Sequence, residues 1–212
     1  MRRIDLHLHT SGSFDCHSEP EAVFRRCLRL GLEPVFVTDH DSIEEALRLR
    51  SSHPGQVIVG QEVTTETGEV IGLYLEEPIP AGLSADEAVE RIKGQGGLVY
   101  LEHPFDSLRR PLDARSIQDL VGSFDIVEVH NSRSSDDANL KAAGLRRTLG
   151  VPGGAGSDAH HIGEIGSVYV ELPDFGSPSE LIRSLEVGRV ISSPNRAAMA
   201  ARRLLMATIG RR

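Results

Sequence analysis

Short apolar runs typical of β-strands alternate along this chain with segments whose apolar residues recur at helical spacing. Helices are expected from about residue 20 to a stop signal at Gly31, over 42–50, from 84, over 135–149 and from 179. An Ala-rich segment at about 195–212 is expected to form a last helix. Strands are expected at residues 4–8, 34–38, 57–63, 70–75, 98–101, 126–129, 152–157, 168–172 and near 190.

Helix caps and the order of these elements indicate the fold class. Ser42 with Glu45, and Ser84 with Glu87, have the spacing of a capping box. Repeated strand-then-helix units favour a parallel sheet with right-handed crossovers. About seven such units predict an α/β protein built as a distorted, seven-stranded TIM-like (β/α)7 barrel. An open doubly wound sheet is the alternative. The 212 residues fit one domain, 1–212, that includes the C-terminal helix at about 195–212.

Histidines and carboxylates gather directly after several of the expected strands. Four clusters are Asp5-Leu6-His7-Leu8-His9, Thr38-Asp39-His40-Asp41, Glu102-His103-Pro104 and Ser157-Asp158-Ala159-His160. In a barrel or a doubly wound sheet the carboxyl ends of the strands share one face, so these side chains are expected to meet there. Burying so many ionisable groups together without a metal ion would cost much desolvation free energy. The sequence therefore predicts a metal site at the carboxyl ends of the strands.

The ordered motifs resemble those of the polymerase and histidinol phosphatase (PHP) family of metal-dependent phosphoesterases, in particular its small stand-alone members. The resemblance covers nearly the whole chain. It rests on His7-Leu8-His9-Thr10, Thr38-Asp39-His40-Asp41, Gly60-Gln61-Glu62, His103-Pro104 and Ser157-Asp158-Ala159-His160. It implies a distorted seven-stranded barrel that binds two or three metal ions. It also implies hydrolysis of a phosphate ester by a hydroxide that bridges the metals.

The resemblance further implies groups of ligands that share one bridging carboxylate. The first group is His7, His9, Glu62 and Asp158, the second is Asp15, His40 and His160, and the third is His103 with the bridging Glu62. Glu69 stands where the family often has a histidine, so it either completes the third group or the site holds two metals. Imidazole and carboxylate ligands without thiolates fit Mn, Fe or Zn, and fit Mg less well.

Supporting roles are expected for residues beside these ligands. Asp39 and Asp41 flank His40 and could orient its ring without binding metal, as metal-bound imidazoles usually require. Arg109 follows His103-Pro104-Phe105-Asp106, and Arg133 lies two residues after Asn131. Both arginines are candidates for binding phosphate oxygens in a bidentate manner.

Composition narrows the expected substrate and setting. A net charge of -8 and an aromatic content of 4% argue against nonspecific binding of nucleic acid, so a small phosphorylated molecule or a nucleotide is expected. The cysteines, Cys16 and Cys27, do not form a disulfide framework, which favours a reducing compartment. No segment resembles a signal peptide or a membrane span, so a cytoplasmic protein without a membrane partner is expected. A homo-oligomer is compatible with these patterns.

Two other functions stay open. Amidohydrolases that cleave C-N bonds also begin with His-X-His on a barrel strand. Many of them use a carboxylated lysine as a bridging ligand, whereas Lys93 and Lys141 fall within expected helices. A noncatalytic interaction module stabilised by metal would keep the fold and bind metal without hydrolysing any phosphate ester.

Overall fold

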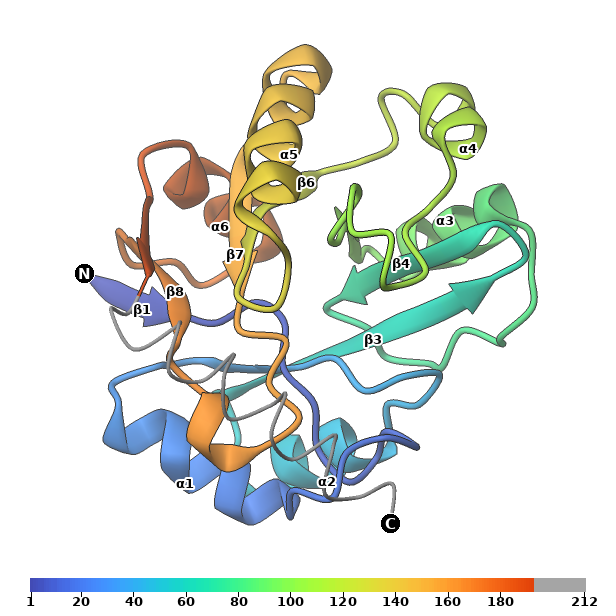
Figure 1. Ribbon diagram of the computed structural model, residues 1–212. Helices are drawn as coiled ribbons and strands as arrows, with labels where there is room; N and C mark the ends of the chain where they lie inside the picture. The colour runs from blue at the N-terminus through green and yellow to red at the C-terminus, as the bar shows by residue number, and fades with distance from the viewer. Residues whose placement is uncertain (193–212) are drawn as a thin grey trace, which may run out of the picture.

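The computed structural model describes residues 1–192, which fold as an α/β protein (Figure 1). The α/β class is therefore confirmed, whereas the helix expected at about 195–212 lies outside the described residues. The elements, in chain order, are β1 (Arg2–Ile4), α1 (Pro20–Arg29), β2 (Val35–Val37), α2 (Glu44–Ser52), β3 (Val57–Thr65), β4 (Gly68–Leu73), α3 (Ala85–Gly94), β5 (Leu98–Leu101), α4 (Ala114–Asp119), β6 (Ile126–Asn131), α5 (Asp136–Leu149), β7 (Gly153–Gly156), the 3-10 turn η1 (Ile162–Glu164), β8 (Val168–Leu172), α6 (Pro178–Glu186) and β9 (Arg189–Ser192).

A curled, six-stranded sheet with the order β2-β3-β4-β5-β6-β7 forms the larger part of the fold. Strands β2 and β3 are parallel, as are β5, β6 and β7, but β4 runs antiparallel to both of its neighbours. The expectation of a wholly parallel sheet is therefore wrong at β4. Only Glu66 and Thr67 separate β3 from β4, and so short a connection makes a hairpin, because a parallel crossover needs a dozen or more residues.

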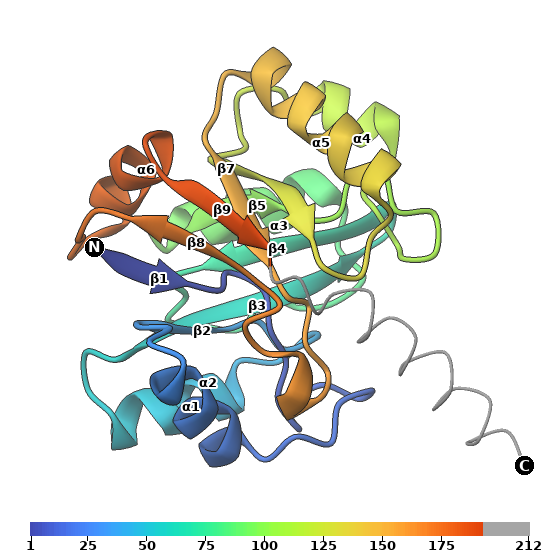
Figure 2. The ribbon, with the colours of Figure 1, turned by 60° about the vertical axis from the view of Figure 1, so that its left-hand side comes forward.

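The remaining strands form a second, antiparallel sheet with the order β1-β8-β9. Its three strands lie side by side in Figure 2. After β1 the chain passes between the two edge strands of the large sheet. Leu6 N donates to Ala155 O at 3.1 Å, and Thr38 N donates to Leu8 O at 3.0 Å. The expected seven-stranded barrel is thus confirmed only in part. Six strands form a half-barrel, and residues 5–9 join its edges by hydrogen bonds without forming a regular strand.

Alternating residues divide the core into two layers. On β5, Leu98 and Tyr100 pack in the layer between the two sheets, whereas Val99 and Leu101 pack in the layer under the helices. Successive side chains of a strand point to opposite faces, so β5 contributes to both layers. Helices α1 and α2 lie side by side over one part of the large sheet in both views (Figures 1 and 2). This packing holds the strand ends in place.

Helix starts differ from the sequence prediction in one case. The capping box at Ser84 is confirmed, because Ser84 N donates to Glu87 Oε2 at 3.2 Å. The prediction of a capping box at Ser42 is wrong, because α2 begins at Glu44. Ser42 Oγ instead accepts a hydrogen bond from Glu44 N at 3.3 Å. The short helix α4 was not expected. Among the described residues, no helix has both the length and the apolar character that a membrane span requires.

Candidate metal centre

The expected ligands converge at one end of the large sheet. His40 follows β2, His103 follows β5 and Asp158 follows β7, while Glu69 lies at the start of β4. Because β4 runs antiparallel to its neighbours, it begins at the edge where they end. The cluster therefore occupies the carboxyl ends of the parallel strands, the place where such folds position their functional groups.

Four buried side chains make up the first group, His7, His9, Glu62 and Asp158. The Nε2 atoms of His7 and His9 are 3.2 Å apart, and they lie 3.1 and 3.2 Å from Oε2 of Glu62. Oδ1 of Asp158 is 3.4 Å from His9 Nε2 and 3.9 Å from His7 Nε2. The first expected group thus comes together around one point.

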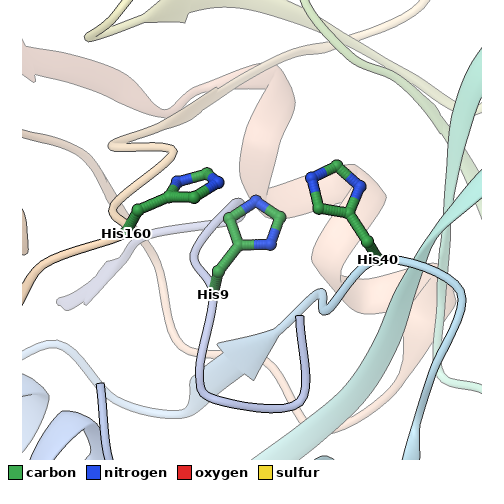
Figure 3. A group of neighbouring side chains, drawn as sticks. All are labelled: His9, His40 and His160. Atoms are coloured by element: carbon green, nitrogen blue, oxygen red, sulfur yellow. The ribbon is translucent and has the colours of Figure 1, made fainter. Parts of the chain in front are cut away.

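The second expected group, Asp15, His40 and His160, comes together beside His9 of the first group, whose ring lies between those of His160 and His40 (Figure 3). The ring centroid of His9 is 4.3 Å from that of His160 and 4.8 Å from that of His40. Asp15 Oδ2 lies 3.0 Å from His160 Nε2, and Asp15 Oδ1 lies 3.8 Å from His40 Nε2. The side chain of Asp15 is 38% exposed, so it lies on the solvent side of the cluster.

Glu62 also reaches the third group. Its Oε1 lies 3.2 Å from His103 Nε2, and its Oε2 lies 3.6 Å from His40 Nδ1. A carboxylate oxygen of Glu69 falls within 4.8 Å of ligand atoms of His40 and Glu62. The carboxylate at the position where the family often has a histidine is therefore part of the cluster.

Burial and neighbouring charges shift the pKa values of the carboxylates and histidines in the cluster. Burial alone would raise the pKa values of Glu62 and Asp158, but the charge of His7 together with the hydrogen bonds and charges of other neighbours outweighs burial and holds both pKa values well below their usual range. Burial alone would lower the pKa of His9, yet Asp158 and Glu62 raise it to about 9. For Glu69, burial and then the charge of Glu62 raise the pKa to about 7. The centre thus keeps ionised carboxylates in a place shielded from water, where a cation is stabilised most strongly.

The donor set fits divalent metal ions. Imidazole nitrogens and carboxylate oxygens from distant segments point at common points, which is the ligand chemistry of Mn, Fe or Zn. The buried Nδ1 of His40 has no hydrogen-bond partner among the described residues, although it faces Glu62. Buried polar atoms are rarely left unpaired, and a bound ion would satisfy this nitrogen.

Asp39 takes a different role from the expected one. Its Oδ1 accepts from Thr10 N at 2.6 Å and from Ser13 Oγ at 2.9 Å. Ser13 Oγ in turn lies 3.0 Å from His9 Nδ1. Asp39 is therefore connected to the ring of His9 through Ser13, and the expectation that it orients the ring of His40 is corrected.

Asp41 also turns away from its neighbour. Its Oδ1 accepts from Thr64 N at 2.7 Å, which ties the turn after His40 to β3. Asp41 has a φ of 51°, so the chain turns at this residue, and its side chain is engaged by β3. The expected orienting role of Asp41 is corrected for the same reason.

Both predicted arginines reach the cluster. Arg109 Nε lies 3.7 Å from Asp158 Oδ2, and Arg133 Nη1 lies 3.4 Å from Asp158 Oδ1. Their side chains are 27% and 19% exposed, so each guanidinium sits between solvent and the buried ligands. This position allows either to meet an anion that enters the centre.

Glu128 was missed as a site residue. Its Oε1 lies 3.2 Å from His7 Nδ1, and Asn131, on the same strand, donates from Nδ2 to Asp158 Oδ2 at 3.4 Å. Strict alternation would place residues three apart on opposite faces, but the register of β6 shifts between Glu128 and His130. One signal was available, because a lone carboxylate inside an apolar strand is rarely buried without a specific partner.

Gly156 gives a test of how closely the ligand-bearing segments pack. A Cβ atom there would lie 2.3 Å from His7 Cβ and 2.8 Å from Glu128 Oε1. We expect Gly156→Ala to destabilise the protein by about 1–3 kcal/mol, the usual cost of overpacking. The measurement is urea unfolding followed by circular dichroism.

The matched control is Gly144→Ala in α5, where an added Cβ has no atom within 4 Å. This change should leave stability unaltered or raise it by up to about 1 kcal/mol, because alanine favours helix. Equal stabilities for the two variants would contradict the close packing of Gly156 against His7.

The chain is similar to a known protein family and to other proteins in sequence. A PHP-associated family model matches residues 136–190. The Methanocaldococcus jannaschii protein MJ0417, whose function is uncharacterized, is 34% identical over 198 residues, which cover 87% of this chain and 79% of that protein.

Two solved structures have a similar fold. One is a two-domain protein from Bacteroides vulgatus that contains a predicted PHP-like metal-dependent phosphoesterase. It shares 16% identity and a TM-score of 0.74 over 90% of this chain and 64% of that one. The other is an amidohydrolase from Chromobacterium violaceum with bound sulfate and no metal. It shares 19% identity and a TM-score of 0.66 over 89% of this chain and 97% of that one.

Proposed function

This chain belongs to the PHP family, and from that premise we propose that it is a metal-dependent hydrolase of phosphate esters that uses two or three divalent ions of Mn, Fe or Zn. The observation that supports this most is the position of Glu62. One of its oxygens faces His7 and His9, and the other faces His103. A carboxylate so placed would join the ligand groups of neighbouring ions.

Metal ions bound here would activate a water molecule and stabilise the negative charge that develops on the phosphoryl oxygens. The chain's own part is to hold its ligands rigidly and to limit the access of water. His7, His9 and Glu62 are buried, whereas the side chain of Asp15 is exposed to solvent. We propose a small phosphorylated metabolite or a nucleotide as the substrate.

Arg109 and Arg133 would hold the phosphoryl group. A guanidinium can donate two parallel hydrogen bonds to phosphate oxygens, and both arginines already lie against the carboxylate of Asp158. An entering phosphate would therefore find cationic partners at the rim of the centre. This arrangement supports an anionic substrate over a neutral one.

The amidohydrolase alternative has less support from the residues present. The chain's two lysines are Lys93 on α3 and Lys141 on α5. Lys93 pairs with Asp125 at 2.5 Å and Lys141 pairs with Asp137 at 2.7 Å, so neither contributes to the cluster as a bridging ligand. We propose Glu62 as the bridging ligand instead.

The proposal is tested by hydrolysis of an aryl phosphate monoester and the matching diester with metal-stripped protein, before and after addition of Mn²⁺. We expect turnover to return with metal and to be lost in His9→Ala and Asp158→Ala. His53→Ala is the control, since His53 pairs with Glu21 at 2.8 Å away from the cluster. Bound metal without turnover of either ester would reject the proposal, and hydrolysis of an amide substrate instead would favour the C-N alternative over a noncatalytic module.

Arg133 offers a separate prediction about substrate binding. We expect Arg133→Ala to raise KM for the phosphate ester about tenfold or more, because a hydrogen bond to a charged group contributes about 1.5–3 kcal/mol. Arg133→Lys should recover only part of this loss, since lysine keeps the charge but not the planar fork. Steady-state kinetics provide the measurement.

The control for Arg133 is Arg115→Ala on α4, where the arginine side chain is 90% exposed. It removes the same charge and should leave KM unchanged. A KM for Arg133→Ala equal to that of Arg115→Ala would show that Arg133 does not hold the phosphate.

A further inference from the structure

Glu128 is a fully buried carboxylate on β6 whose two oxygens contact several neighbours. Its Oε1 lies 3.2 Å from His7 Nδ1 and accepts from the hydroxyl of Tyr100 at 3.2 Å. Its Oε2 accepts from His103 N at 2.9 Å and from Asn131 Nδ2 at 3.0 Å. The backbone N-H of His103 and the amide group of Asn131 can only donate, so Oε2 of Glu128 is the acceptor of both bonds.

We propose that Glu128 is the positioning residue of the metal centre, holding the ring of His7 and the backbone of His103 in the arrangement that metal binding requires. The inference rests on the proposed function, since it concerns the same centre. As a carboxylate, Glu128 would accept a hydrogen bond from the Nδ1-H of His7. Nε2 of His7, the atom that faces Glu62 at 3.1 Å, is then the nitrogen left to bind a metal ion.

His103 is the second expected ligand that Glu128 contacts. Its φ of 28° lies in a region that side-chain-bearing residues rarely adopt and that costs about 1–3 kcal/mol. The hydrogen bond from His103 N to Glu128 Oε2 holds the chain in this conformation, with His103 Nε2 turned toward Glu62 at 3.2 Å. Glu128 therefore supports ligands on both sides of the bridging carboxylate.

The other histidines of the cluster show why Glu128 matters for His7 in particular. His9 Nδ1 is held by the neutral hydroxyl of Ser13 at 3.0 Å. The buried Nδ1 of His103 has no hydrogen-bond partner among residues 1–192. A carboxylate on a ligand imidazole fixes its tautomer and makes it a stronger donor to metal, and losing such a partner usually weakens metal binding about 10–100-fold.

The variant Glu128→Gln tests whether Glu128 positions His7 and His103 or only fills space in the core. Glutamine has nearly the same shape, but one of its two positions must carry an amide group that only donates. Placed toward His7, the amide would oppose the Nδ1 hydrogen and favour the tautomer whose Nε2 cannot bind metal. Placed toward His103, it would meet the backbone N-H. Either orientation of the glutamine therefore disrupts one contact, with His7 Nδ1 or with the backbone N-H of His103.

The experiment is titration of metal-stripped protein with Mn²⁺ by calorimetry, together with nitrogen-15 NMR of the histidine rings in protein loaded with diamagnetic Zn²⁺. We expect Glu128→Gln to bind Mn²⁺ about 10–100-fold more weakly and to lose the Nδ1-H tautomer of His7. Glu128→Asp keeps the charge on a shorter side chain, so its affinity for Mn²⁺ should lie between those of Glu128→Gln and the wild type. The control is Glu171→Gln on β8, whose partner is Arg3 at 2.9 Å, and it should bind as the wild type does.

The outcomes distinguish this inference from the proposed function. If the wild type binds Mn²⁺ and both Glu128 variants bind it equally well with the tautomer unchanged, Glu128 is not a positioning residue and the metal centre stands. If the wild type itself binds no Mn²⁺, the metal centre and this inference fall together. Glu128→Asp also keeps the test decisive should Glu128→Gln fail to fold.

Discussion

Glu62→Gln is expected to lower kcat for phosphate ester hydrolysis by about three orders of magnitude, equivalent to about 4 kcal/mol of transition-state stabilisation. The physical reason is that both oxygens of Glu62 are in use, Oε2 toward His7 and His9 and Oε1 toward His103. Glutamine must turn an amide group toward one of these sides, where it repels a cation instead of binding it. Steady-state kinetics with the metal content of each sample determined give the measurement.

The matched control for Glu62 lies on the same hairpin. Glu66 is exposed in the turn between β3 and β4, so Glu66→Gln removes an equal charge outside the cluster. It should leave kcat within about twofold of the wild type. Retention of more than a tenth of the activity by Glu62→Gln with its full complement of metal would show that Glu62 does not bridge.

Addition of Mn²⁺ to metal-stripped protein should raise the melting temperature by roughly 5–10 °C at a concentration 100 times the dissociation constant. That excess contributes about 2.7 kcal/mol per site. For a protein of this size each kcal/mol shifts the midpoint by about 2–4 °C. The gain arises because the cluster buries ionised carboxylates beside imidazole nitrogens that lie 3.2 Å apart, a costly arrangement that a bound ion would stabilise. Differential scanning calorimetry provides the readout, and a chelator should reverse the shift.

Variants show whether this stabilisation comes from the cluster. Asp158→Asn should lose most of the shift, because Asp158 Oδ1 faces His9 Nε2 at 3.4 Å. His53→Ala, outside the cluster, should keep it. A shift that is the same in Asp158→Asn as in the wild type would place the bound metal elsewhere on the protein.

Most of the ligand set could be predicted because each motif is local and directly follows a strand. His7, His9, His40, His103 and Asp158 belong to short patterns, and the rule that parallel strands end on one face brings distant patterns together without knowledge of any contact. Their convergence in the structure agrees with that prediction. Their roles as ligands remain the proposal that the metal titrations test.

Supporting residues were harder to predict, since their roles depend on contacts that no local pattern contains. Asp39 stands beside His40 in sequence yet is linked to His9 through Ser13. Glu128 faces the cluster together with Asn131 only because a register shift in β6 interrupts strict alternation. Neighbours in sequence are therefore a poor guide to which side chain supports which ligand.

The sequence by itself determined the α/β class, the alternation of elements and the residues that form the cluster, because apolar periodicity and short motifs depend on neighbouring residues alone. Only the tertiary structure decided that β4 runs antiparallel, that residues 5–9 close the gap between β2 and β7, and that Glu128 contacts His7. Strand direction and cross-strand contacts are decided by which segments pair across the whole chain, and that choice depends on the packing of the entire core.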